Sequence, residues 1–302
     1  MTNIPVSERK HWIGASESPA LFGASPYTTR FELWHQKVGN IPIADISHDE
    51  RVMAGQFMEP SIAAWANEKW HWPILNVKEY RQSPHIHRMG SSLDFETIDG
   101  LEPVEIKNVD NLIFRDNWEH DGDAITSAPD HMLLQVQHQL ACPVAGRKQL
   151  AERGWLIACV GGNKLYRMEI PRHDAMIQRI NDEVEGFWAT VEANEAPDPQ
   201  FDIDADAINL LYHGMGMEIA DLRGHERATE LAAEYLDALS IENSAKDLKK
   251  SRLAELKVLM NDAKGAIMDD GYKISAAHLK ESTSVRKAHW RFSITKAREP
   301  HA

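Results

Sequence analysis

The chain has little cysteine, no long apolar run and no excess of positive charge. Among its 302 residues only Cys142 and Cys159 are cysteines. Two are too few for a disulfide framework, a four-cysteine zinc site or a four-cysteine iron–sulfur cluster. No run reaches the roughly 18 apolar residues of a membrane helix, and the first residues lack the apolar core of a secretory signal. We therefore expect a cytoplasmic protein with no membrane contact.

Acidic residues outnumber basic ones, 46 Asp and Glu against 33 Lys and Arg, for a net charge of −13. This balance excludes a generally basic, histone-like coat, although an acidic chain can still bind nucleic acid through a local basic surface. Basic residues do gather in 271–302, where seven Lys and Arg stand against two acidic residues. Either this tail binds DNA, with Arg286, Lys287 and Arg291 as candidate contacts, or its charges only cover the solvent face of a strand pair.

The spacing of apolar and turn-forming residues predicts an α/β protein. Amphipathic stretches between Pro and Gly residues indicate helices, expected over 16–22, 28–38, 48–69, 130–141 and 173–192. Short apolar or alternating stretches indicate strands, expected over 74–80, 86–95, 102–109, 155–160 and 165–170. The first three strands are expected to form an antiparallel meander. The last two are expected to form a hairpin that turns at Gly161-Gly162.

A composition change divides the chain. Residues 195–204 hold two prolines and several acidic residues, which is typical of a linker or a domain edge. We therefore expect one domain over 1–204 and a C-terminal extension over 205–302. Within the extension the pattern predicts a long polar helix over 226–268 with a thin apolar seam, followed by basic strands over 272–296.

Three residues in the expected meander indicate a catalytic site. Glu105 and Lys107 stand at i and i+2 on one strand, so their side chains share a face, and Asp94 on the preceding strand brings a second carboxylate to the same point. Mg²⁺ prefers carboxylates and waters, and the main-chain carbonyl of Ile106 can add a further ligand. Lys107 would orient or help deprotonate an attacking water and offset the charge that develops on a phosphate. Phosphodiester hydrolysis needs these groups, although the same pattern alone also occurs as a surface ion pair.

Three further sequence boxes accompany this one, in order along residues 9–190. They are IGASES with LFGASPY within Ile13 to Tyr27, GQFMEP from Gly55 to Pro60, and Gln135-Val136-Gln137. Together the four boxes resemble the phage lambda exonuclease and YqaJ-type viral recombinase family of the PD-(D/E)XK nuclease superfamily. The resemblance implies a restriction-endonuclease-like core, in which helices flank a central mixed sheet.

The resemblance also implies roles for individual residues. Mg²⁺, with two ions expected and Mn²⁺ as a substitute, is implied to bind Asp94, Glu105 and the Ile106 carbonyl. Glu59 is implied to reach the second ion or its water, with a plain solvated carboxylate as the alternative. Lys107 is placed beside the attacking water. Gln135, with Gln137 as a further candidate, is implied to position the catalytic residues or the scissile phosphate. Ser16 and Arg9 are implied to hold the 5′-terminal phosphate of the DNA, with Lys10 as the alternative to Arg9.

Helix geometry offers an alternative role for Ser16 and limits the roles of the two glutamines. Ser16 is equally suited to cap the N-terminus of the first helix, and it can do both. Gln135 and Gln137 stand at i and i+2 on a helix and cannot share a face, so at most one of them is expected to be catalytic.

The function implied is a Mg²⁺-dependent 5′-to-3′ exonuclease of double-stranded DNA ends. It would leave 3′ overhangs for a single-strand annealing protein in phage-type homologous recombination, in a bacterial host. A homotrimeric ring around the DNA is also implied. One alternative is a structure-specific or restriction-type endonuclease on the same core, and the other is a non-catalytic DNA-binding recombination scaffold. The intact set of Asp94, Glu105 and Lys107 argues against the scaffold.

Overall fold

The computed structural model describes residues 8, 10–77, 80–145, 150–212, 219–278, 280–281 and 294. Outside these residues lie four of the predicted DNA contacts, Arg9, Arg286, Lys287 and Arg291. The chain divides into two compact units, residues 1–212 and 213–302. Among the described helices, none combines the length and the apolar character that a membrane span requires.

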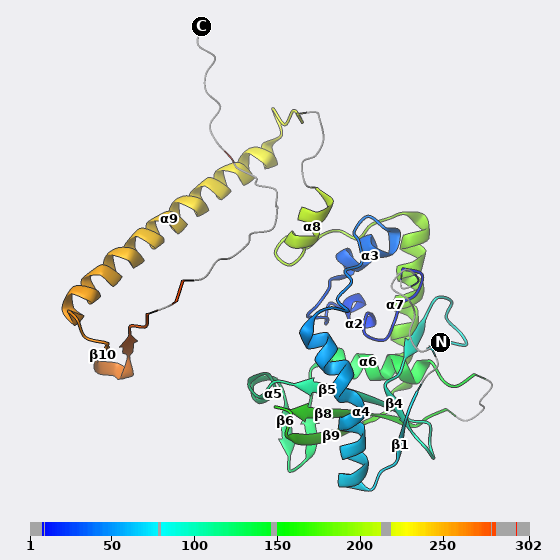
Figure 1. The fold of residues 1–302 in the computed structure, drawn as a ribbon. Helices are drawn as coiled ribbons and strands as arrows, with labels where there is room; N and C mark the ends of the chain where they lie inside the picture. The colour runs from blue at the N-terminus through cyan, green and yellow to red at the C-terminus, as the bar shows by residue number, and fades with distance from the viewer. Residues whose placement is uncertain are drawn as a thin grey trace. The chain divides into compact units, whose positions relative to one another are not determined.

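A seven-stranded sheet organises the first unit (Figure 1). Its strands, in spatial order, are β1 (Ile74–Asn76), β4 (Phe95–Thr97), β5 (Pro103–Val109), β8 (Arg153–Val160), β9 (Lys164–Pro171), β7 (Ala124–Ser127) and β6 (Glu119–Asp121). β5 pairs with β8 and β7 with β9 in parallel, whereas the other neighbours are antiparallel. The sheet is therefore mixed, as expected for a PD-(D/E)XK core.

Helices lie on both faces of this sheet, α6 and α7 on one and α4 on the other. The helices of the first unit are α2 (Ser18–Leu21), α3 (Arg30–Val38), α4 (Glu50–Trp70), α5 (Asn111–Asn117), α6 (Asp130–Ala141), α7 (Asp174–Ala193) and α8 (Ala205–Leu211). Alternate residues of β8 point to opposite helices: Leu156 and Ala158 pack in the core that holds α6 and α7, whereas Ile157 packs in the core that holds α4. Because both faces of β8 are buried, its sequence is a continuous apolar run rather than an alternating one.

Several predicted helices and strands are confirmed, together with the residues that begin and end them. The helix over 130–141 has the predicted bounds. α3 begins after Thr29, whose side chain accepts a hydrogen bond from the Glu32 N–H, and it ends at Gly39 with a φ of 95°. β8 and β9 form the predicted hairpin, and both turn glycines, Gly161 and Gly162, have positive φ.

Other predictions about the first unit were wrong. Ser16 does not cap α2: Glu17 occupies the N-cap position, and α2 begins at Ser18, whose hydroxyl donates to the Ala15 carbonyl. The meander is interrupted, because β2 (Tyr80–Gln82) and β3 (Gly90–Ser92) pair with each other in a separate two-stranded sheet. The sequence pattern also gave no sign of α5, β6 and β7, which are short and largely exposed.

Helix α8 belongs to the first unit. Its Ala207 is buried with Phe31 and Ile41. Just before it, the Asp204 carboxylate accepts a hydrogen bond from the Thr29 hydroxyl. These contacts join the acidic segment after α7 to the start of α3.

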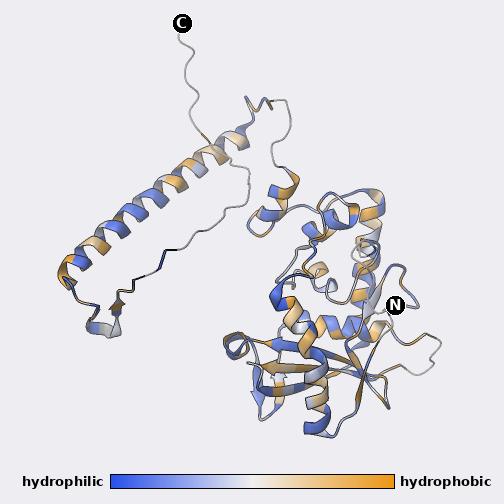
Figure 2. Ribbon diagram, in the orientation of Figure 1, coloured by the Kyte–Doolittle hydropathy of each residue, from blue (hydrophilic) through white to orange (hydrophobic). Residues whose placement is uncertain are grey.

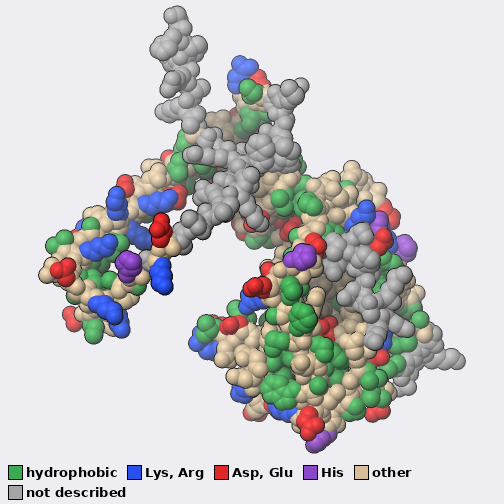
Figure 3. All heavy atoms as spheres, in the orientation of Figure 1, with side chains coloured by type: hydrophobic (Ala, Val, Ile, Leu, Met, Phe, Trp, Pro, Cys, Tyr) green, Lys and Arg blue, Asp and Glu red, His purple; other side chains and the backbone are tan. Residues whose placement is uncertain are grey.

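The second unit begins with α9 (Glu226–Met260), in which no residue is buried. Hydrophilic residues predominate along it with apolar ones between them (Figure 2), and both acidic and basic side chains lie on its surface (Figure 3). The helix ends eight residues before the predicted end, because Asn261 has a φ of 50° and a β-hairpin follows. The hairpin joins β10 (Gly265–Ile267) to β11 (Lys273–Ser275) through a 3-10 turn at Asp269–Gly271. Most of the predicted basic strand region beyond β11 lies outside the described residues.

The close packing of α6 on β8 can be tested at Gly154. A Cβ added there would lie 2.5 Å from Val136 Cγ1 and 3.2 Å from Pro103 Cγ. We expect Gly154→Ala to lower the free energy of unfolding by about 1–3 kcal/mol, because α6 must shift to admit it. Chemical denaturation followed by circular dichroism measures this change.

Gly186→Ala is the matched control. Gly186 lies in the exposed part of α7, and nothing stands within 4 Å of an added Cβ. This substitution is expected to raise the free energy of unfolding by about 0.5–1 kcal/mol. Equal stability of Gly154→Ala and the wild type would contradict the described packing.

Candidate active site

Asp94 and Glu105 converge at the edge between β4 and β5. In this antiparallel pair Phe95 lies opposite Val104, which places Asp94, one residue earlier, next to Glu105. The Asp94 carboxylate accepts a hydrogen bond from the Ile106 N–H at 3.1 Å. Since the N–H and C=O of one extended residue point to the same side of a strand, the Ile106 carbonyl faces this edge as well. The structure thus brings together the three metal-ligating groups that the strand spacing predicted.

Glu105 is only 3% exposed, and its carboxylate accepts hydrogen bonds from three side chains. Its Oε1 accepts from Lys107 Nζ at 2.5 Å and from Gln135 Nε2 at 2.7 Å. Its Oε2 accepts from Gln139 Nε2 at 2.5 Å. Because a buried carboxylate is costly unless its oxygens are hydrogen-bonded, these donors both stabilise Glu105 and fix its direction.

Helix α6 supplies two of those donors, Gln135 and Gln139, from adjacent turns of one face. Gln139 was missed in the sequence analysis. Its signal was its i+4 spacing from Gln135, which places both amides on the same side of the helix.

Gln137 points elsewhere. Its Nε2 donates to the Pro171 carbonyl at 2.8 Å, and its Oε1 accepts from the His173 N–H at 3.0 Å. It is buried between α6 and the start of α7. Gln135 and Gln137 therefore face different ways, and the structure does not bring Gln137 to the carboxylates.

Glu59 projects from α4 and is half-buried. Burial raises its pKa, the charge of Glu105 raises it further, and Lys107 acts in the opposite direction. The charges of Glu105 and Lys107 thus act on Glu59. This agrees with the predicted place of Glu59 beside Asp94, Glu105 and Lys107, which we call the cluster.

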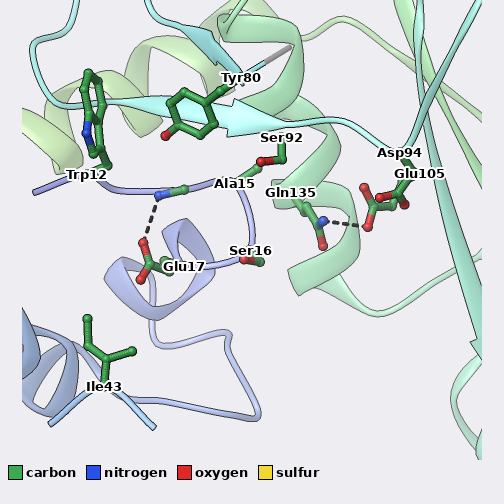
Figure 4. Close-up of a pocket in the computed structure, with 11 residues that line it drawn as sticks. Trp12, Ala15, Ser16, Glu17, Ile43, Tyr80, Ser92, Asp94, Glu105 and Gln135 are labelled. Atoms are coloured by element: carbon green, nitrogen blue, oxygen red, sulfur yellow. Dashed lines mark hydrogen bonds between the residues drawn. The ribbon is translucent and has the colours of Figure 1, made fainter. Parts of the chain in front are cut away.

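A cavity of about 310 Å³ opens onto Asp94, Glu105 and Gln135 (Figure 4). Trp12 and Tyr80 stand toward the other end, and Ser16 and Ser92 contribute hydroxyls. The remaining lining residues are Gly14, Ala15, Glu17 and Ile43. The Glu17 carboxylate is engaged, because it accepts from the Gly14 N–H at 2.9 Å and from Lys37 Nζ at 2.7 Å. The two carboxylates thus stand at one end of a cleft that also offers hydroxyls and aromatic rings.

The cluster is rich in negative charge. Burial raises the pKa of Asp94 well above its usual range, and the charges of Glu105 and Glu59 raise it further, against the opposing effects of Lys107 and the Ile106 N–H. Burial alone would lower the pKa of Lys107, but Glu105 and Asp94 outweigh it and raise that pKa. Lys107 is therefore an ammonium at neutral pH.

The donor set fits Mg²⁺. The described residues contain no group of three or more His, Cys, Asp or Glu side chains arranged around one metal position. Here two carboxylates and one carbonyl face the same edge, next to a cleft that can admit water. Mg²⁺ is commonly bound through one or two carboxylates and retains several waters, so this set suits it.

Thermal unfolding should show whether a cation binds at Asp94. The folded-state pKa of Asp94 lies above the ordinary 3.8, so the folded protein binds the extra proton. The contribution of this group to stability then falls as the pH rises from about 4 through the folded-state pKa. At pH 8 in EDTA we expect Asp94→Asn to have a higher Tm than the wild type, because it removes a buried charge that Lys107 and the Ile106 N–H offset only in part.

Added Mg²⁺ is expected to raise the Tm of the wild type by a few degrees, about 2–4 °C per kcal/mol of stabilisation, and to leave that of Asp94→Asn unchanged. The exposed Asp99, substituted as Asp99→Asn, is the control and should respond to Mg²⁺ as the wild type does. Equal responses of Asp94→Asn and the wild type would exclude a cation at Asp94.

Comparisons with known proteins find similar sequences. Residues 6–148 match the model of the YqaJ-like viral recombinase domain. The "Uncharacterized protein YqaJ" of Bacillus subtilis (strain 168) is 25% identical over 181 residues, which are 60% of this chain and 53% of that protein. The chain thus spans about half the length of this relative.

Solved structures are also similar. An alkaline exonuclease (LHK-Exo) from Laribacter hongkongensis matches 68% of this chain and 97% of its own, with a TM-score of 0.48 and 19% identity. The structure of LHK-Exo in complex with dAMP matches to the same extent. The match over residues 6–148 and the similarity to YqaJ confirm the family resemblance predicted from the sequence.

Proposed function

We propose that the protein is a Mg²⁺-dependent deoxyribonuclease, a 5′-to-3′ exonuclease of double-stranded DNA that leaves 3′ overhangs. One observation carries this proposal: Asp94 and Glu105 stand together at one end of a cleft of about 310 Å³, and Lys107 donates a hydrogen bond to Glu105. The match to a viral recombinase domain supports a role in recombination.

Asp94, Glu105 and the Ile106 carbonyl would hold Mg²⁺, with Mn²⁺ as a substitute, and Glu59 would reach a second ion or its water. The ion, when bound, polarises the phosphate and lowers the pKa of an attacking water. Gln135 and Gln139 keep Glu105 in one orientation, so the ligand does not need to reorganise during the reaction.

Lys107 brings a cationic group to this point. Its ammonium lies on the same strand face as Glu105 and is bonded to that carboxylate. As a permanent hydrogen-bond donor, it can orient the attacking water and offset the negative charge that develops on the phosphate. A protonated lysine positions the water rather than accepting its proton.

The cleft has room for the end of a DNA strand, since ligand pockets begin at about 300 Å³. Ser16 stands on its wall, and in this proposal it holds the 5′-terminal phosphate together with Arg9. Arg286, Lys287 and Arg291 would add phosphate contacts elsewhere on the duplex.

The proposal extends to assembly and partners. Three copies would enclose the duplex in a ring, so that an acidic protein needs positive potential only along its channel. The 3′ strand would pass to a single-strand annealing protein of a phage or prophage, in the cytoplasm of a bacterial host.

Digestion of linear duplex DNA tests the activity. Substrates with 5′-phosphate and 5′-hydroxyl ends are incubated with the wild type in Mg²⁺ or in EDTA. We expect Mg²⁺-dependent release of mononucleotides, faster from 5′-phosphate ends. Lys107→Ala should lower the rate at least a hundredfold, because it removes preorganised positive charge, whereas the exposed Lys246→Ala should digest as the wild type does.

Covalently closed circles distinguish the rival functions. Cutting of circles would replace the exonuclease by a structure-specific or restriction-type endonuclease. Binding of DNA without cleavage of any substrate would make the protein a recombination scaffold.

The part played by Gln139 can be tested separately from folding. Gln139→Leu leaves Glu105 Oε2 without its donor, so we expect kcat to fall about tenfold and the Mg²⁺ concentration for half-maximal activity to rise. The same substitution at the exposed Gln178 should change neither. An unchanged Mg²⁺ dependence in folded Gln139→Leu would show that this amide does not position the ligand.

A further inference from the structure

A second, smaller cavity lies on the Lys107 side of the cluster. It has a volume of about 110 Å³ and shares Ser16 and Gln135 with the larger cleft. Lys107 lines this cavity, whereas Glu105 lines the larger one. Its other lining residues are Pro19, Ser25, Tyr27, His131 and Met132. The ion pair of Glu105 and Lys107 therefore lies between two spaces, and we call the smaller one the Lys107 cavity.

Hydrogen-bond donors line the Lys107 cavity and no carboxylate does. Lys107 offers its ammonium. The Ser25 Oγ accepts from the N–H groups of Tyr27 and Thr28 at 3.2 and 3.4 Å, which leaves its own proton free to donate. The buried Nε2 of His131 has no hydrogen-bond partner within the described part of the chain. A buried polar atom without a partner is rare in folded proteins.

The position and size of the cavity favour an anion. His131 stands in the first turn of α6, where the helix dipole attracts negative charge. The cavity, at about 110 Å³, can admit a phosphate group.

Tyr27 stands at the rim with 81% of its surface exposed. Its ring meets that of His131 edge to face, with 6.1 Å between centroids. An exposed tyrosine beside a phosphate-sized cavity is suited to stack on a nucleobase, because aromatic rings in single-strand sites do so for every base.

We propose that the Lys107 cavity binds the phosphate next to the scissile one in the DNA strand. This inference rests on the proposed function. Ser25 and His131 donate to that phosphate, and Tyr27 stacks on the nucleotide attached to it. The cleaved bond then lies between two sites, with one neighbour in the larger cleft and the next phosphate in the Lys107 cavity. The subsite positions the strand and takes no part in the chemistry.

Single methylphosphonate linkages test the phosphate contact, since each removes the charge of one phosphate. A set of duplexes carries the neutral linkage at successive positions from the 5′ end. For the wild type we expect kcat/KM to fall about tenfold when the linkage occupies the Lys107 cavity, and no change for a linkage ten nucleotides further in. The double variant Ser25→Ala/His131→Ala should lose about tenfold on the natural duplex and nothing more on the neutral linkage.

The matched control is Ser251→Ala/His278→Ala, two exposed residues of the second unit, which should behave as the wild type at every linkage. Equal additional losses in the wild type and in Ser25→Ala/His131→Ala would overturn the phosphate contact. If the wild type cleaves no natural duplex, the proposed function itself fails and this inference fails with it.

Fluorescence of 2-aminopurine placed next to that linkage tests Tyr27 without cleavage, with Ca²⁺ in place of Mg²⁺. We expect binding to the wild type and to Tyr27→Phe to quench the probe, and binding to Tyr27→Ala to quench it several-fold less. Tyr212→Ala, which alters another exposed tyrosine, should quench as the wild type does. Identical quenching by Tyr27→Ala and the wild type would remove Tyr27 from the subsite.

Discussion

The buried carboxylate of Glu105 is the constraint on which the rest of the structure depends. An ionised group that is 3% exposed is tolerated only with hydrogen bonds and charge compensation. Lys107 supplies the charge from the same strand, and Gln135 and Gln139 supply amides from α6. Helix α6 must therefore pack against β5 with one fixed rotation about its axis and one fixed position along it. In that same orientation its apolar residues, among them Val136 and Leu140, fill the core beside β8.

That arrangement also explains why the cluster suits a divalent cation. Asp94 is brought beside Glu105 by the pairing of β4 with β5, and Glu59 acts on both from α4. Lys107 is already bonded to Glu105, so the negative charge of the remaining carboxylates is only partly offset. The fold thus stabilises a site that gains from one more positive charge, and in the proposed function the cleft beside it receives the phosphodiester.

Much of this could be predicted where short-range rules decide the outcome. The i, i+2 spacing of Glu105 and Lys107 fixes their shared face on any strand, and Pro129 and Pro143 limit the helix between them. Gln139 could not be found in this way, because its role depends on which face of α6 meets β5. Ser16 has the residue type of a helix cap, yet the backbone turns so that Glu17 takes that position. The end of α9 was misplaced since polar, helix-favouring residues continue past Met260, whereas the hairpin of β10 and β11 is decided by strand pairing.

The central claim is that Asp94 and Glu105 hold a divalent cation beside Lys107. Crystals soaked in Mn²⁺ and measured at its absorption edge would locate such an ion directly. The account predicts an anomalous peak at about 2.0–2.3 Å from one oxygen each of Asp94 and Glu105 and from the Ile106 carbonyl, absent in crystals of Asp94→Asn. A peak elsewhere, or none at these oxygens at millimolar Mn²⁺, would contradict it.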